Sequence, residues 1–219
     1  MHPIFFLSEV IPPNSKEEMG NYFYNLFGNT NPLVVEIGSG NGHFLVEYAM
    51  RHQDKNFIGT EILAGRTRKF HSKIQKRELR NILVFKGDAR QFVWEYLYEE
   101  SVHEFIILFP DPWPKKRHHK HRILTAPFIQ MLRLRLKAGG TVSIATDYTE
   151  YRDWILDEFG RNGGFINICS QGYTKYPEDY PKTLFKQRFK EEKSDIYFLC
   201  FKKSGKISDF DSYPQSQNS

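Results

Sequence analysis

The sequence predicts an α/β fold, a doubly wound and mostly parallel sheet with an antiparallel edge at its C-terminal end. Short apolar runs alternate with helical segments along most of the 219 residues. Successive runs start 22 to 37 residues apart, which leaves room for a helix that crosses over the sheet between parallel strands. The runs are almost continuously apolar, as expected for strands that are covered on both faces.

Five runs supply the expected parallel strands, and a helix follows each of them. The expected strands are Leu33–Ile37, Asn56–Glu61, Ile82–Lys86, Glu104–Phe109 and Thr141–Thr146. The expected helices are Gly42–Arg51, Ala64–Arg80, Arg90–Glu99, Arg122–Lys137 and Tyr148–Asn162. The β-branched and aromatic residues of the runs favour strands because they pack well on a pleated surface.

The C-terminal part follows a different pattern. Phe165–Ser170 and Ile196–Lys202 are strand-like without a clear helix between them, so we expect them to pair antiparallel at the sheet edge. Residues 204–219 are rich in Ser, Asp, Gln and Asn, and we expect a disordered tail there. We expect one domain over residues 1–203, because a chain of this length suits a single core.

Composition excludes several classes of protein. A hydrophobic content of 40% and an aromatic content of 16% exclude a wholly disordered chain. The mean hydropathy is −0.56 and no long uncharged apolar run exists, so we expect no membrane partner. Residues 1–10 lack the basic region of a signal peptide, which favours a cytoplasmic protein. Cys169 and Cys200 are too few for a disulfide framework, and we expect buried thiols, with one bridge between them as the alternative.

Positive charge is concentrated in two segments. The net charge is +5, and 12 of the 31 Lys and Arg residues lie in residues 64–80 and 115–122, together with a single acid, Glu78. Such a field favours a polyanionic partner, most simply nucleic acid. The alternative is a solvated helix face and a flexible basic loop.

A glycine-rich turn follows the first expected strand. Gly38, Gly40 and Gly42 have the spacing G-x-G-x-G, which differs from the dinucleotide-binding and P-loop patterns. Glu36 precedes the turn, and an acid at that position suits a cationic ligand better than a pyrophosphate. The motif resembles the first motif of methyltransferases that use S-adenosylmethionine (SAM), which carries an ammonium group and a sulfonium. An ordinary strand-to-helix turn is the alternative.

Two further acids follow the next two strands. Glu61 ends its strand, where a carboxylate can accept hydrogen bonds from both hydroxyls of a ribose. Asp88 can accept a hydrogen bond from an adenine amino group. The alternatives are a solvated Glu61 and an Asp88 that caps the following helix.

A proline-rich and then basic loop follows the fourth strand. Prolines flank Asp111 and restrict its backbone, and the run Lys115–Arg122 must face solvent or phosphate. Trp113 can stack on a base or anchor the loop. The clustered histidines lack the cysteines or spaced acids of a zinc site, so we expect no metal.

The segment FPDPWPKKRHHKHR resembles the signature of the bacterial tRNA (guanine-N7-)-methyltransferases. VVEIGSGNGHF, NFIGTEI, KGDARQF and ATDYTEY are similar to the other blocks of that family, in the same order, over about residues 30–200. The resemblance implies a Rossmann-like class I methyltransferase, with SAM as cofactor and tRNA as partner. The implied reaction is methyl transfer to N7 of guanine 46 in the tRNA variable loop.

The resemblance also implies residue roles. Asp111 would be the catalytic residue beside SAM, and Lys115 and Asp147 would contact the guanine nucleotide. An N-cap of the following helix is the alternative for Asp147. Thr183 matches a further substrate-binding block, whereas Lys186 stands where the family usually has Glu. The implied SAM-binding residues are Glu36, Gly38, Gly40, Gly42, Glu61, Asp88 and Asp111. The implied RNA-contacting residues are Arg117, His118, His119, Lys120, His121 and Arg122.

Guanine N7 offers a lone pair and has no proton to lose, so in-line displacement needs no general base. The main alternative is a non-catalytic RNA-binding protein on a degenerate methyltransferase fold, which Lys186 favours. A methyltransferase for small molecules or protein and a nicotinamide oxidoreductase fit the basic loop and the glycine spacing less well. Both a monomer and a homodimer agree with the sequence.

Overall fold

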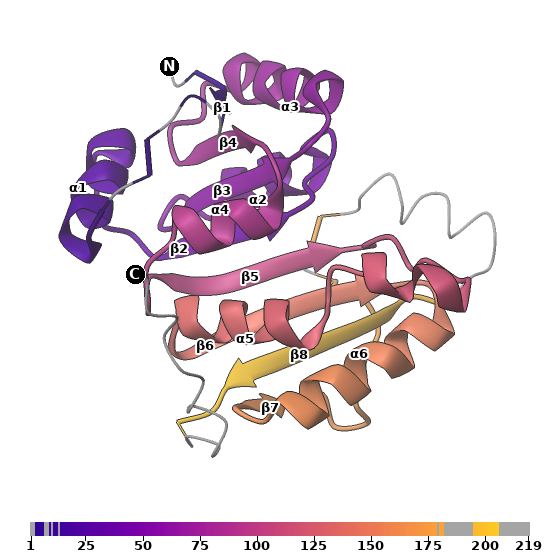
Figure 1. The fold of residues 1–219 in the computed structure, drawn as a ribbon. Helices are drawn as coiled ribbons and strands as arrows, with labels where there is room; N and C mark the ends of the chain where they lie inside the picture. Colours follow the sequence, from indigo (N-terminus) through magenta and orange to yellow (C-terminus); the bar gives the residue numbers. More distant parts are fainter. Residues whose placement is uncertain are drawn as a thin grey trace.

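A computed structural model describes residues 3–6, 9, 11–12, 14–178, 180–181 and 195–205. Within this part of the chain, one eight-stranded sheet forms the centre of the molecule (Figure 1). The strands are β1 (Phe5–Phe6), β2 (Leu33–Ile37), β3 (Asn56–Glu61), β4 (Ile82–Lys86), β5 (Val102–Leu108), β6 (Leu136–Thr146), β7 (Phe165–Asn167) and β8 (Tyr197–Lys203). The helices are α1 (Lys16–Phe27), α2 (His43–Arg51), α3 (Ala64–Lys76), α4 (Ala89–Glu95), α5 (Ala126–Arg135), α6 (Thr149–Asn162) and the 3-10 helix η1 (Lys116–His121).

The strand order is β1-β4-β3-β2-β5-β6-β8-β7. Strands β1 to β6 pair in parallel, and β8 pairs antiparallel with both β6 and β7. This arrangement confirms the predicted doubly wound sheet and its antiparallel edge. The chain winds outward from β2 through β3 and β4, and then returns to β5 on the other side of β2. Ligands of such sheets bind at this reversal, beyond the carboxyl ends of the strands.

Apolar side chains cover both faces of the sheet. One cluster joins the sheet to α1, α4, α5 and α6, and it includes Phe92, Phe128 and Phe159. The other joins the sheet to α2 and α3, and it includes Leu45 and Phe70. Burial on both faces explains why the central strands are almost continuously apolar.

The observed bounds of β2, β3 and β4 agree with the predicted strands residue for residue. The fourth predicted helix, Arg122–Lys137, is wrong at both ends, because α5 spans Ala126–Arg135. Arg122 is buried before the helix begins, and Leu136 already starts β6. Strand β6 (Leu136–Thr146) is therefore longer than the predicted strand Thr141–Thr146, and it includes Gly139 and Gly140.

Three other predicted ends differ by three residues or more, each for a local reason. Helix α3 stops at Lys76 instead of Arg80, and Glu78 takes a left-handed φ of 52°. Helix α4 stops at Glu95, after which Tyr96 and Leu97 are buried in the core. Strand β7 stops at Asn167, whose Oδ1 accepts a hydrogen bond from the Cys169 amide and so turns the chain.

Helix α1 was not predicted, although the sequence contains a signal for its start. Ser15 Oγ accepts a hydrogen bond from the Glu18 amide (3.1 Å), and Glu18 Oε2 accepts one from the Asn14 amide (2.7 Å). The S-x-x-E pattern of residues 15–18 is typical of such a helix start.

Cys169 and Cys200 are free thiols, so the alternative bridge is not formed, and both are only partly buried, which is less than the predicted burial. No described helix has the length and apolarity that crossing a membrane requires. The expected tail at residues 204–219 lies outside the described residues except for Ser204 and Gly205.

Candidate active site

The predicted acidic residues come together along one edge of the sheet. The order β4-β3-β2-β5-β6 places the carboxyl ends of five parallel strands side by side (Figure 1). An acidic residue lies at the end of each of these strands or shortly after it. These residues are Glu36 on β2, Glu61 on β3, Asp88 after β4, Asp111 after β5 and Asp147 after β6.

The glycine turn has a backbone that other residues would strain. Gly38, Gly40 and Gly42 have φ angles of 75°, 56° and 69°. A Cβ on Gly42 would also lie 2.0 Å from the ring of Phe70, so glycine is needed there for space as well. The Ser39 amide donates a hydrogen bond to the Thr60 carbonyl (2.8 Å), which ties the turn to the end of β3.

Glu36 is a buried acid with unused hydrogen-bonding capacity. Glu36 is only 3% exposed, and its Oε2 has no hydrogen-bond partner among the described residues. Burial, and secondly the charge of Glu61, raise the pKa of Glu36 to about 8, while a hydrogen bond from Ser39 opposes the shift. A buried carboxylate in this condition suits a cationic group that enters the site and supplies the missing partner.

Glu61 and Asp88 lie on the β3 and β4 side of Glu36. Glu61 is 6% exposed, and its Oε1 accepts a hydrogen bond from the Leu63 amide (2.8 Å). Asp88 caps α4, because its Oδ1 accepts from the amides of Arg90 (2.7 Å) and Gln91 (3.3 Å). The capping alternative for Asp88 is therefore confirmed. Both cap bonds use the same oxygen, which is compatible with a ligand bound at Oδ2.

Lys73 supports the glycine turn from α3, a contact that the sequence analysis missed. Its Nζ donates a hydrogen bond to the Asn41 carbonyl (2.6 Å) and lies 3.2 Å from His43 Nε2. Burial and then the charge of Lys73 lower the pKa of His43, which favours a neutral ring beside the ammonium group. Lys73 is about thirty residues from the turn, so no local sequence pattern identifies the pair.

The loop after β5 presents Asp111 on a constrained backbone. Phe109 and Trp113 both take left-handed φ angles, 51° and 45°, which non-glycine residues rarely adopt. The Phe109 amide donates a hydrogen bond to the Ala145 carbonyl (2.8 Å), and Asp111 itself is exposed. Strained backbone conformations of this kind occur preferentially at functional sites, and here two of them lie on either side of Asp111.

Arg122 does not lie on the surface where RNA contact was predicted. It is 0% exposed, and its Nε donates a hydrogen bond to the Pro112 carbonyl (2.8 Å). Its Nη2 pairs with Glu150 Oε1 (3.0 Å), and its guanidinium lies 4.8 Å from the Trp154 ring centroid. The prediction that Arg122 contacts RNA is therefore wrong, because its side chain is fully buried and cannot reach a phosphate. Arg122 holds the Asp111 loop in place.

The other predicted RNA-contacting residues lie on or beside η1. Arg117, Lys120 and His121 are exposed, and so is Lys115, which was predicted to contact the guanine nucleotide. His118 is partly buried, and its ring lies 5.8 Å from the Trp113 ring. His119 is partly buried beside Trp154, and its Nε2 lies 3.4 Å from Glu150 Oε1.

Trp113 combines both predicted properties, because it is 36% exposed and also contacts the rings of His118 and His121. No three His, Cys, Asp or Glu side chains group as a metal site within the described part of the chain.

Asp147 is exposed directly after β6 and does not occupy the N-cap position of α6. The residue at the cap of α6 is Tyr148, with no side-chain capping bond, and the Tyr148 amide donates to Thr146 Oγ1 (3.2 Å). The N-cap alternative for Asp147 is therefore wrong. Thr183 and Lys186 lie outside the described residues.

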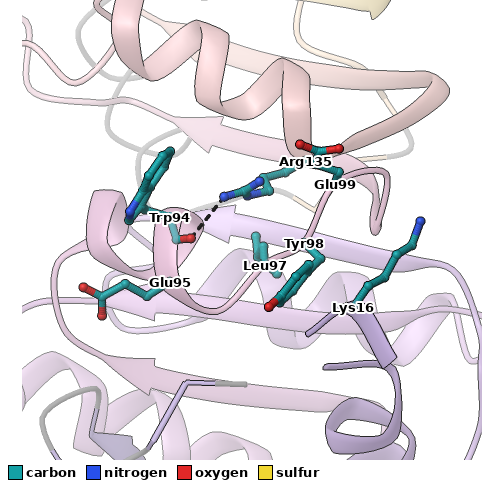
Figure 2. Close-up of a pocket in the computed structure, with 7 residues that line it drawn as sticks. All are labelled: Lys16, Trp94, Glu95, Leu97, Tyr98, Glu99 and Arg135. Atoms are coloured by element: carbon teal, nitrogen blue, oxygen red, sulfur yellow. Dashed lines mark hydrogen bonds between the residues drawn. The ribbon is translucent and has the colours of Figure 1, made fainter. Parts of the chain in front are cut away.

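A separate surface pocket lies at the opposite, amino-terminal edge of the sheet (Figure 2). Its lining residues are Lys16, Trp94, Glu95, Leu97, Tyr98, Glu99 and Arg135. Arg135 Nη2 donates to the Trp94 carbonyl (3.1 Å), and the guanidinium lies 5.5 Å from the Trp94 ring. None of the predicted site residues lines this pocket, so it plays no part in the site.

Comparison with known proteins shows which family the chain belongs to. The family model described as "Putative methyltransferase" matches residues 30–199. The tRNA (guanine-N(7)-)-methyltransferase of Nitrosomonas eutropha is 37% identical over 180 residues, which cover 82% of this chain and 80% of that protein. The enzyme of the same name from Nitrosomonas europaea is 38% identical over 164 residues, covering 75% and 73%.

Solved structures support the fold. A SAM-dependent methyltransferase from Aquifex aeolicus has a TM-score of 0.56 at 11% identity, over 84% of this chain and 89% of that one. The donor set fits the cofactor of that fold, because the unpartnered Glu36 oxygen and the two neighbouring acids suit a cationic nucleoside. The cofactor is S-adenosylmethionine. By sequence and by fold, the chain belongs to the tRNA (guanine-N7)-methyltransferase family.

Proposed function

We propose that this protein transfers the methyl group of SAM to N7 of a guanine in tRNA, at position 46 of the variable loop, by in-line displacement. The observation that carries the proposal is the buried Glu36 carboxyl group, whose Oε2 has no partner among the described residues, beside the strand that leads to Asp111. The relatives are tRNA (guanine-N(7)-)-methyltransferases by name, which supports the same substrate here. We place the activity in one domain, residues 1–203.

In this proposal three acids hold the cofactor, which supplies an electrophilic methyl group on its sulfonium when bound. Glu36 pairs with the ammonium group, Glu61 accepts from the ribose hydroxyls, and Asp88 accepts from the adenine amino group through Oδ2. The backbone of Gly38, Gly40 and Gly42 permits the close approach of the ligand.

Asp111 acts at the reacting atoms. Positive charge moves onto the guanine ring as N7 is alkylated, and a carboxylate held near the ring stabilises that change. No residue needs to remove a proton from N7, so the chain's task is alignment and charge placement. Arg122, Phe109 and Trp113 keep the Asp111 loop in one conformation.

The substrate side is formed by residues beyond β5 and β6. Asp147 accepts from the guanine N1–H or its exocyclic amine, which is possible because it is exposed and does not cap α6. Lys115 contacts the guanine nucleotide. Arg117, His118, His119, Lys120 and His121 contact the RNA, whereas the buried Arg122 is removed from this set. We keep Thr183 and Lys186 as substrate-binding residues.

The test is to incubate the protein with labelled SAM and unmodified tRNA and to map the label to a nucleotide. Label at N7 of guanine 46 is the expected result, and Asp111→Asn serves as the matched inactive variant. Tight tRNA binding without any methyl incorporation would favour the alternative, a non-catalytic RNA-binding protein.

A further inference from the structure

Helix α3 carries basic side chains that the proposed active site does not use. The helix contains no acidic residue. Its buried residues are Thr67, Phe70 and Ile74, which face the core. Its exposed face consists of Gly65, Arg66, Arg68, Lys69 and Lys76. We call Arg66, Arg68, Lys69 and Lys76 the α3 basic face.

This arrangement is unfavourable for the isolated helix. Arg66 and Lys69 are three residues apart, and Lys69 and Lys73 are four apart, spacings at which like charges repel. Arg66 and Arg68 also lie near the N-terminal end, where the helix dipole disfavours cations. The pKa of Lys73 is lowered mainly by burial and secondly by the charges of Arg77 and Lys69, which agrees with this repulsion.

Helix α6 shows that the chain neutralises cations elsewhere. Arg152 pairs with Asp153, and Arg161 pairs with Asp157 and lies 3.8 Å from Glu158. Within the described part of the chain, by contrast, no residue of the α3 basic face has an ion-pair partner. A face kept cationic against local stability indicates an external anionic partner.

The position of α3 connects this face to the site. The helix begins three residues after Glu61, so its first turn lies at the carboxyl edge of the sheet, and the helix then runs back along the sheet (Figure 1). Arg66 and Lys69 lie near that edge, and Lys76 lies at the far end of the helix. A polyanion that reaches the site and continues past β3 would follow this face.

We propose that the α3 basic face is a second tRNA-binding surface, which contacts the phosphate backbone independently of residues 115–121. The inference rests on the proposed function for the identity of the RNA. RNA is favoured over an anionic membrane because no exposed residue within Ala64–Lys76 has an apolar side chain, which a helix needs along one face in order to enter a lipid surface. The exposed Ile62 and Leu63 precede the helix and do not form such a face.

The test is a triple variant, Arg66→Gln, Lys69→Gln and Lys76→Gln. Lys73 is left intact because it supports the glycine turn. We expect the Kd for tRNA to rise at least about tenfold at ~0.1 M salt, and the slope of log K against log salt to fall by about 2. Because like-charge repulsion is removed, the thermal midpoint of the free protein should stay the same or rise, and SAM affinity should not change.

The matched control is Lys16→Gln, Lys137→Gln and Lys202→Gln, which removes the same charge from exposed positions elsewhere. An equal loss of tRNA affinity in this control would overturn the inference, since net charge alone would explain it. So would unchanged tRNA affinity in the α3 variant, or a loss confined to binding of phosphatidylserine vesicles.

Wild-type activity separates the two proposals. If the wild type transfers no methyl group to tRNA, the proposed function fails. If it methylates tRNA and the α3 variant binds tRNA as tightly as the wild type, only the second surface fails.

Discussion

Arg122 Nε donates a hydrogen bond to the carbonyl of Pro112 across 2.8 Å, and this bond joins a buried cation to the loop that carries Asp111. The same guanidinium contacts the rings of Tyr151 (5.0 Å to the centroid) and Trp154 (4.8 Å). Arg90 Nη2 donates to the Arg122 carbonyl (3.1 Å), which connects α4 to the same point. The contacts of the buried Arg122 therefore fix the Asp111 loop to the core.

Replacing Arg122 should damage both folding and turnover. Arg122→Met keeps much of the volume but removes the bond to Pro112 and the contact with Glu150, so we expect a loss of roughly 2 kcal/mol in the free energy of unfolding. Methyl transfer at saturating SAM should fall more than SAM affinity. Urea unfolding and single-turnover assays measure the two effects. Arg117→Met, on the exposed part of the loop, should leave stability within about 0.5 kcal/mol, and equal destabilisation by both variants would contradict the assignment.

SAM affinity should rise with pH. The pKa of Glu36 is raised to about 8, so in the free protein the carboxyl is largely protonated below that pH, whereas an ammonium group prefers the carboxylate. Affinity should increase from about pH 6 and level off above about pH 8, with proton release on binding. Calorimetry in buffers of different ionisation enthalpy measures both.

Glu36→Gln is the control for this pH dependence. The variant should bind SAM weakly and without the rise. Because the folded pKa of Glu36 lies above the unfolded value, the native state holds more protons between about pH 4.5 and 8, and this group lowers stability as pH rises through that window. The free variant should therefore be more stable than the wild type above pH 8. A wild-type affinity that does not vary with pH would contradict the role of Glu36.

Asp111→Asn should separate binding from chemistry. The amide keeps the size of the side chain but removes the negative charge, so we expect turnover to fall on the order of 100-fold while the Kd for SAM stays within about twofold. Single-turnover kinetics at saturating tRNA and calorimetry with SAM give the two values. Unchanged turnover would remove Asp111 from the mechanism.

Neutralising Lys115, Arg117 and Lys120 together should weaken tRNA binding and flatten its salt dependence. All three side chains are exposed, so stability should stay within about 0.5 kcal/mol for each change. Filter binding over a range of salt concentrations measures the slope, which should fall by about 2. An unaltered slope would mean that this loop does not touch RNA.

The strand bounds of β2, β3 and β4 and the acids at their ends could be read from the sequence, because strand pattern and strand-end position are local properties. The roles of individual side chains could not be predicted as well from the sequence. Arg122 and Arg117 look alike in the basic run, yet one is fully buried and the other exposed. Asp88 and Asp147 both follow a strand, but only Asp88 caps a helix.

The sequence by itself determined the alternation of strands and longer helices from Leu33 onward, the glycine turn and the family, since each depends on residues that are close along the chain. Only the tertiary structure decided that Glu36 is buried with no partner for its Oε2 among the described residues, that Arg122 supports the Asp111 loop, and that Lys73 reaches the glycine turn. Burial and contacts between distant residues depend on how layers pack, and a residue's type does not specify what will cover it.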